Sequence, residues 1–288
     1  MRIHDDGTIS LTIGFSPCPN DTFIFDALVN GRIPTGKLRF EPVIDDVEAL
    51  NRLALASALD ITKVSVRAFH DCSVDYQLLN AGSALGFGVG PLLIKRPETE
   101  KIQRVAIPGV NTTASFLFSL FHPEVTDRRE YLFSEIEDAV LSGEVDAGVI
   151  IHENRFTYAE RGLEKVVDLG NSWEERYARP IPLGGIAIQR ALDEGVRRQV
   201  DRLVAQSLQH AWNNPSDAAA FIELHAQEMD PEVRRNHIGL YVNDYSLNLG
   251  ETGRSAIRFF LESVRQLDAG RAVPMEPLFV PNASEVHA

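Results

Sequence analysis

Short apolar runs alternate with helical patterns over roughly the first 190 residues. Residues 9–15 alternate between apolar and polar positions and predict a strand, and Asn20 or Asp21 can begin the helix that follows it. A second strand is expected at residues 40–44, and the Asp45-Asp46 pair can begin the next helix because acids favour the positive helix end. LDITKVS predicts a third strand. This alternation indicates an α/β protein with a largely parallel sheet.

The pattern restarts in the middle of the chain. GFGVGPLLIKR predicts one long strand leaving the first unit, and the polar segment KRPETEKIQ indicates a crossing to a second unit. New strands are expected at RVAIPG and EVDAGVII, whereas from Ala191 onward the pattern predicts helices alone. We therefore expect two lobes with a cleft between them, the first from residues 1–95 plus 186–288 and the second from residues 96–185. The C-terminal helices should pack back on the first lobe.

Composition and charge narrow the classes of function. The chain has 288 residues, of which 44% are hydrophobic and 24% charged, as in an ordinary globular protein of about two domains. Its net charge of -13 argues against nucleic-acid binding, although a local pocket could still hold a small anion. No apolar run is long enough to span a membrane, and the N-terminus lacks the features of a signal peptide. We expect a cytoplasmic protein, either a monomer or a homodimer.

Polar residues follow two strands of the first unit, where a parallel sheet would open onto the cleft. Ser16 and Asn20 lie in the turn after the first strand, together with Asp21. Lys63, Val64 and Ser65 end the third strand, and an ammonium group beside free backbone amides favours an anion pocket. The alternative is that the first group serves as turn and cap residues and that Lys63 is an ordinary surface lysine.

The second unit offers two further candidates. Thr112, Thr113 and Ala114 open a helix after a strand, where free N–H groups and hydroxyls could hold a carboxylate, although simple N-capping is the alternative. His152 ends the apolar strand AGVII. A lone histidine is more often structural, but imidazole titrates near neutral pH, and this one should be delivered into the cleft as a general base.

Several catalytic signatures are absent from the sequence. It contains no P-loop, no GxSxG elbow and no HExxH motif, and its GFGVG lies at a strand instead of opening a capped helix. Cys18 and Cys72 have no zinc-ligand spacing, so no metal site is expected. These absences favour acid–base chemistry without a cofactor.

Several blocks together resemble the 1,4-dihydroxy-6-naphthoate synthases of the futalosine route to menaquinone. The most specific are SPCPNDTF and IIHENRFTY, supported by DITKVS, GFGVGPLL, IPGVNTTASFL and VVDLGNSWEERYARPIPLGGIAI, and the similarity covers about residues 9–250. The resemblance implies the two-lobed fold of type 2 periplasmic binding proteins. It also implies conversion of cyclic dehypoxanthinylfutalosine to the naphthoate by carbon–carbon bond cleavage, with release of a three-carbon fragment.

The resemblance further places the catalytic base at His152 and the substrate-binding segments at residues 63–65 and 112–114. Asp21 and Tyr158 would be the next bases to consider. Two other interpretations stay open: a chorismate dehydratase of the same pathway, which shares the fold, and a solute-binding protein without chemistry. The missing signal peptide argues against the solute-binding protein, and the two specific blocks favour the naphthoate synthase.

Overall fold

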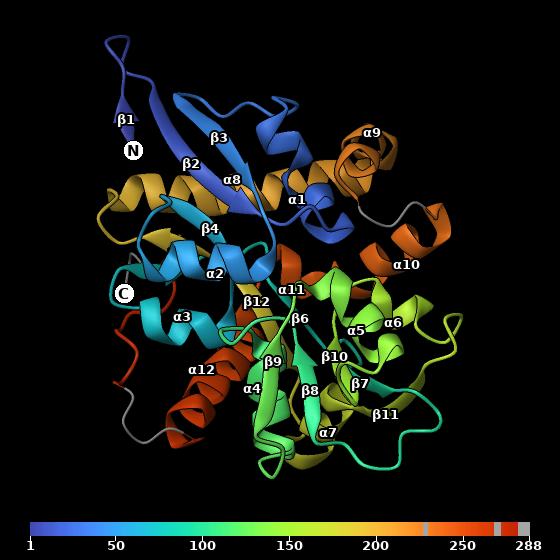
Figure 1. Cartoon of the computed structure of the whole chain (residues 1–288). Coiled ribbons are helices and arrows are strands. Elements are labelled where there is room, and N and C mark those ends of the chain that lie inside the picture. The colour runs from blue at the N-terminus through green and yellow to red at the C-terminus, as the bar shows by residue number, and fades with distance from the viewer. Residues whose placement is uncertain (227–229, 268–271, 282–288) are drawn as a thin grey trace.

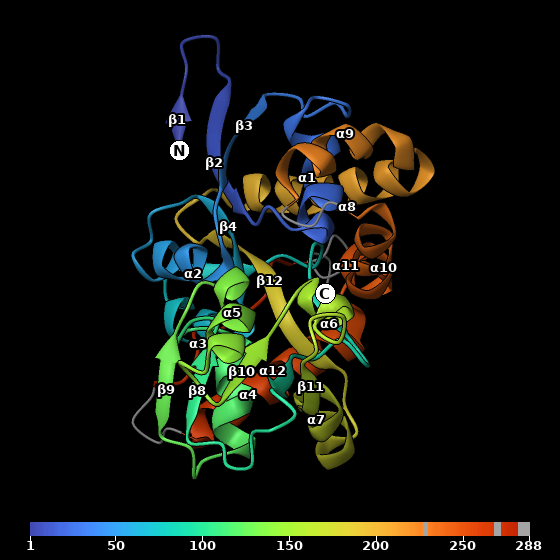
Figure 2. The same ribbon diagram turned by 45° about the vertical axis from the view of Figure 1, so that its right-hand side comes forward.

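The structure is a computed structural model that describes residues 1–226, 230–267 and 272–281. Its described residues form two sheets, one in each lobe, and Figures 1 and 2 show one lobe above the other. The first sheet consists of β1 (Arg2–Ile3), β2 (Ile9–Phe15), β3 (Leu38–Ile44), β4 (Ile61–Ser65), β5 (Tyr76–Leu78), β6 (Ala84–Gly86) and β12 (Ile181–Gln189). The second consists of β7 (Leu92–Lys95), β8 (Arg104–Ile107), β9 (Asp127–Glu130), β10 (Ala147–Ile150) and β11 (Glu164–Asp168).

Helices cover both sheets, and the C-terminal helices return to the first lobe. There α8, α9 and α10 pack on α1, while α12 packs on α3 and β12. The helices are α1 (Pro19–Val29), α2 (Val47–Leu55), α3 (Val66–Cys72), α4 (Thr113–Phe121), the 3-10 turn η1 (Phe133–Glu135), α5 (Ile136–Ser142), α6 (Asn154–Thr157), α7 (Leu169–Tyr177), α8 (Glu194–Asn213), α9 (Pro215–His225), α10 (Pro231–Tyr241), α11 (Asp244–Leu247) and α12 (Gly250–Leu267).

The chain crosses between the sheets a few residues earlier than the sequence predicts. GFGVGPLLIKR is not one strand, because β6 belongs to the first sheet and β7 to the second. Gly88 between them has a left-handed backbone with φ of 69°, and Pro91 lacks an N–H for a sheet ladder. The return crossing precedes β12, which starts at Ile181, whereas the predicted second lobe extends to residue 185. Residues 227–229, 268–271 and 282–288 of the predicted first lobe lie outside the described residues.

The sheets are mixed, which corrects the expectation of a largely parallel sheet. Within each lobe, β2 runs parallel to β3 and β4, and β8 runs parallel to β9 and β10. The strands next to the crossings run the other way: β7 is antiparallel to β10, and β12 to β4. A helix that connects two strands of one sheet makes them parallel, but a strand that arrives from the other lobe is free of that constraint.

The α1 and α2 helices start differently, and the difference matters for the site. Asp46 caps α2 as predicted, since its side chain accepts hydrogen bonds from the N–H groups of Glu48 and Ala49. By contrast, α1 begins at Pro19 with Cys18 as its N-cap, so the expected capping by Asn20 or Asp21 is wrong. Proline suits the first helical position, and the two polar side chains are thereby placed inside the first turn, where they have other partners.

The lobes are in direct contact around the cleft. A single apolar core includes Val64 of the first lobe, Ile107 and Phe116 of the second, and Phe260 of α12, whose ring lies 4.9 Å from that of Phe116. Across the cleft, the Glu48 carboxylate of α2 accepts hydrogen bonds from residue 111 at the start of α4. The structure therefore presents the lobes closed against each other.

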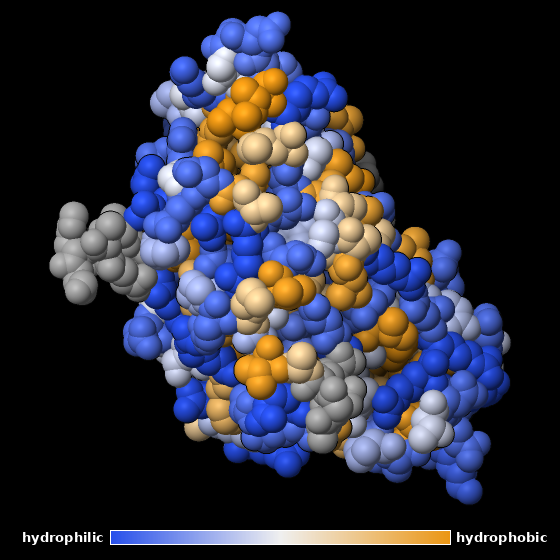
Figure 3. Space-filling model, turned by 90° about the vertical axis from the view of Figure 1, so that its left-hand side faces the viewer, coloured by the Kyte–Doolittle hydropathy of each residue, from blue (hydrophilic) through white to orange (hydrophobic). Residues whose placement is uncertain are grey.

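Hydrophobic residues on the face drawn in Figure 3 form several groups separated by hydrophilic ones. Among the described residues, no helix combines the length and the apolar character that crossing a bilayer requires.

Candidate active site

A pocket lies between the lobes, lined by residues from both. Its lining includes the turn after β2 and the first turn of α1, the end of β4, the start of α4 and the segment after β10. The pocket is lined by the residues that the sequence predicts first as substrate-binding and by the histidine predicted as the base: Ser16, Asn20, Lys63, Val64, Ser65, Thr112, Thr113, Ala114 and His152.

One wall of the pocket carries a buried ion pair. The Lys63 ammonium lies 2.6 Å from the Asp21 carboxylate. The Ser16 hydroxyl donates to Oδ2 of Asp21 at 2.7 Å, and the Asn20 amide donates to Oδ1 at 2.9 Å. Because both carboxylate oxygens accept hydrogen bonds and face an ammonium group, Asp21 is the counter-ion of Lys63 and a poor general base.

His152 reaches the pocket through an unusual backbone conformation. It follows β10 with φ of 58°, in the left-handed region that residues other than glycine seldom adopt and that is enriched at functional sites. Its Nε2 atom is shielded from solvent and has no hydrogen-bond partner among the residues that the structure describes. Burial lowers the pKa of His152 to about 4, so the imidazole is neutral at pH 7.

The start of α4 differs from the sequence-based expectation in one respect. The Thr112 hydroxyl donates to Gly109 O, and the Thr113 hydroxyl donates to Leu183 O at 2.7 Å. Both hydroxyl protons therefore already have acceptors within the protein and are not available to a ligand. The backbone N–H groups of Thr113 and Ala114 have no acceptor in the described part of the chain, so they are the donors that remain for an anion.

The end of β4 is held firmly by its neighbours. Ser65 donates its backbone N–H to the Asn51 amide oxygen at 2.8 Å, and its hydroxyl accepts from the Asn51 nitrogen at 3.1 Å. Antiparallel pairing with β12 fixes Val64 opposite Gly185. A Cβ at Gly184 would lie 3.2 Å from the Lys63 side chain, so glycine there leaves room for the lysine.

Sequence reasoning missed the contribution of α10. His237 is fully buried, and its Nε2 donates to Asn20 Oδ1 at 2.9 Å, since the Asn20 nitrogen already donates to Asp21. Its ring lies 6.2 Å from that of His152, and Tyr241 on the same helix lines the pocket. Burial raises the pKa of Tyr241 to about 12. No local signal predicts a contact between residues 217 positions apart.

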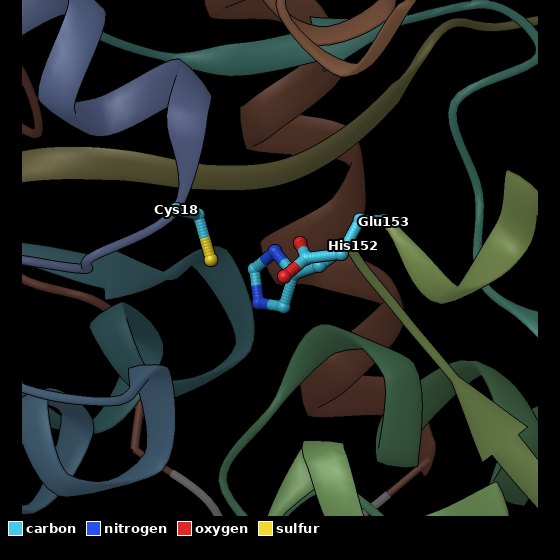
Figure 4. A group of neighbouring side chains, drawn as sticks. All are labelled: Cys18, His152 and Glu153. Atoms are coloured by element: carbon cyan, nitrogen blue, oxygen red, sulfur yellow. The ribbon is translucent and has the colours of Figure 1, made fainter. Parts of the chain in front are cut away.

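Two further side chains, Tyr158 and Cys18, bear on the site. Tyr158, considered as an alternative base, does not line the pocket and packs instead against the core of the second lobe. Cys18 approaches His152 and Glu153 across the cleft, although the cysteine spacing predicts no metal site. Their sulfur, nitrogen and oxygen atoms all lie within 4.8 Å of one another, and Figure 4 shows the three side chains converging.

The fold is that of the periplasmic binding proteins, closed around a pocket. An alkanesulfonate-binding protein from Xanthomonas axonopodis pv. citri has a TM-score of 0.67 with this chain at 12% identity, covering 94% of this chain and 97% of its own. At that identity the likeness shows the fold alone.

Residues 11–266 match the family model described as menaquinone biosynthesis, and the chain belongs to this family. Two relatives are named 1,4-dihydroxy-6-naphthoate synthase. The protein from Thermus thermophilus is 46% identical over 94% of this chain and 99% of its own, and that from Streptomyces coelicolor is 41% identical over 88% and 92%. Since both names are those of enzymes, the chain is an enzyme of menaquinone biosynthesis.

Proposed function

We propose that the protein converts cyclic dehypoxanthinylfutalosine to 1,4-dihydroxy-6-naphthoate by carbon–carbon bond cleavage, with His152 as the general base. The observation that carries this proposal is the shielded Nε2 atom of a neutral imidazole that lines the interlobe pocket. A histidine in this state has a lone pair ready for a proton and no competing partner in the described protein. The names of the two relatives support the product, 1,4-dihydroxy-6-naphthoate.

The proposed cleavage runs in the retro-aldol sense. His152 removes the proton of a substrate hydroxyl, and the oxygen electrons form a new C=O bond as the adjacent carbon–carbon bond breaks. The released electron pair is delocalised onto a neighbouring carbonyl oxygen, which becomes an oxyanion, and aromatisation of the ring supplies driving force. Lys63, with a charge balanced by Asp21, is available to stabilise negative charge in the pocket.

The substrate carboxylate would bind at the start of α4. Anions favour a helix N-terminus because the first N–H groups lack partners and point toward the ligand. The N–H groups of Thr113 and Ala114, which have no acceptor among the residues that the structure describes, meet that description. The pocket thus offers an anion site on the second lobe and an ammonium group on the first.

The proposed activity is tested by incubating the full chain with cyclic dehypoxanthinylfutalosine and chromatographing the products for the naphthoate. A parallel incubation with chorismate tests for the dehydratase of the same pathway. Naphthoate formation supports the proposal. Conversion of chorismate, or binding of the futalosine derivative without turnover, would replace it with one of the other two interpretations.

Thr113→Val is expected to raise KM with a smaller effect on kcat. The valine cannot donate to Leu183 O, so the start of α4 loses a hydrogen bond to β12. The backbone N–H donors of residues 113 and 114 then shift, which weakens substrate binding. Thr113→Ser keeps the hydroxyl and is the matched control, expected to stay near the parent KM. Steady-state kinetics measure both variants. An unchanged KM in folded Thr113→Val would show that the substrate carboxylate does not bind at this helix end.

The acid limb of kcat/KM is expected at about pH 4, well below the usual histidine range. Burial disfavours the imidazolium, so His152 stays neutral down to about pH 4 and loses its function as a base only below that pH. A pH–rate profile with a chelator present measures the limb, with circular dichroism at each pH to follow folding. A limb near the ordinary histidine pKa of about 6.5 would mean that His152 is solvated in the free enzyme.

A further inference from the structure

Three metal-binding side chains meet where the lobes touch. Cys18 stands at the start of α1 in the first lobe, while His152 and Glu153 follow β10 in the second. A thiol sulfur, an imidazole nitrogen and a carboxylate oxygen lie within 4.8 Å of one another, and Figure 4 shows the side chains directed into one space. The lobes must be closed for this set to assemble.

The ligand types and their spacing suit zinc. Zinc binds sulfur, nitrogen and oxygen at about 2.0–2.3 Å, which places tetrahedral ligands about 3.3–3.6 Å apart. Separations of up to 4.8 Å exceed this spacing by at most about 1.5 Å, a difference that rotation of the three side chains can remove. His152 also presents an Nε2 atom that is shielded from solvent and has no hydrogen-bond partner among the described residues, so it is available to a metal.

We propose that Cys18, His152 and Glu153 form a Zn²⁺ site that bridges the two lobes and inhibits the enzyme. As the sulfur–zinc bond forms, the Cys18 thiol releases its proton to solvent. The lone pair of His152 is then shared with the metal and cannot accept a substrate proton. Three protein ligands leave a fourth position for water.

The bridge has a second consequence for the pocket. Cys18 and Glu153 are 2% and 6% exposed, so a metal held between them lies inside the closed cleft. Because one ligand belongs to the first lobe and two to the second, bound zinc holds the lobes together and opposes entry of the substrate. The binding does not depend on the proposed reaction, whereas the inhibition rests on His152 as its base.

Cobalt provides the direct test, because Co²⁺ occupies zinc sites and absorbs in the near ultraviolet when a thiolate is a ligand. The full chain is freed of metal with a chelator and titrated with Co²⁺, alongside Cys18→Ser and Cys72→Ser. Serine is a favourable N-cap, so Cys18→Ser should keep the start of α1. Cys72 is the matched control: it is also buried, but it lies on α3 and its thiol donates to Phe69 O, as a serine hydroxyl can.

The parent chain and Cys72→Ser are expected to develop the thiolate band with one equivalent of Co²⁺ and to lose it when Zn²⁺ is added. Cys18→Ser should lack the band and bind Co²⁺ at least tenfold more weakly. No thiolate band in the parent, or an equal band in Cys18→Ser, would overturn the site.

Activity is a separate measurement. Zn²⁺ should inhibit the parent and Cys72→Ser reversibly, with recovery on adding chelator, and should have at least tenfold less effect on whatever activity Cys18→Ser retains. Equal inhibition of Cys18→Ser would overturn the inhibitory role. If the chain forms no naphthoate at all, the cobalt titration still decides the metal site, so the two proposals fail in distinguishable ways.

Discussion

His152→Asn is expected to lower kcat by roughly 10²–10⁴-fold while leaving KM within a few-fold of the parent value, since a general base acts mainly on the chemical step. Asparagine tolerates the left-handed backbone better than most residues, so the turn after β10 should keep its course. The amide has no basic lone pair to take the proton. Single-turnover and steady-state kinetics together would separate chemistry from binding.

The matched control for this substitution is Tyr158→Phe. Tyr158 lies six residues from His152 in the same segment but packs away from the pocket, so its variant should keep kcat. A folded His152→Asn enzyme with near-normal kcat would remove His152 as the base. Loss of kcat in Tyr158→Phe would instead show that Tyr158 takes part in the proton transfer from outside the pocket.

Local signals in the sequence predict the individual elements well. The alternation in residues 9–15 gives β2 with its observed bounds, and Asp46 caps α2 as its position before an apolar face indicates. Both follow from interactions within a few residues, which a sequence displays directly. The turns at the ends of these strands could therefore be recognised as candidate site positions before their partners were known.

The partners themselves depend on contacts far apart in the chain. His237 bonds to Asn20 across 217 positions, and Cys18 meets His152 only because the lobes close. The sequence suggests that the Thr113 hydroxyl could bind an anion, but in the structure it donates to Leu183 O of β12. Tertiary geometry decides each of these, and no periodicity or capping pattern carries that information.

The crossing between the lobes shows a further limit of sequence patterns. GFGVGPLLIKR has the apolar character of one buried strand, yet its residues belong to two sheets. The break falls at the glycine-rich stretch before Pro91, where the backbone turns through a left-handed Gly88. Composition indicates that both halves are buried, but not that they are buried in different lobes.

Lys63→Met is expected to weaken both stability and substrate binding. Methionine has nearly the length of lysine without its charge, so the buried Asp21 carboxylate loses its counter-ion. Removing one partner of a buried pair typically costs about 3–5 kcal/mol of unfolding free energy. If Lys63 also binds the substrate anion, as proposed, loss of that charged hydrogen bond, worth about 1.5–3 kcal/mol, should raise KM about 10–100-fold.

The double variant Lys63→Met with Asp21→Asn separates the two effects. Its neutral amide needs no counter-ion, its oxygen can still accept from Asn20, and its nitrogen can donate to the Ser16 hydroxyl, which then accepts. Urea denaturation should therefore show part of the lost stability restored. Substrate binding should stay weak, because no ammonium group returns to the pocket. Recovery of the parent KM in the folded double variant would show that Lys63 serves only to neutralise Asp21, and the substrate anion would then depend on the start of α4 alone.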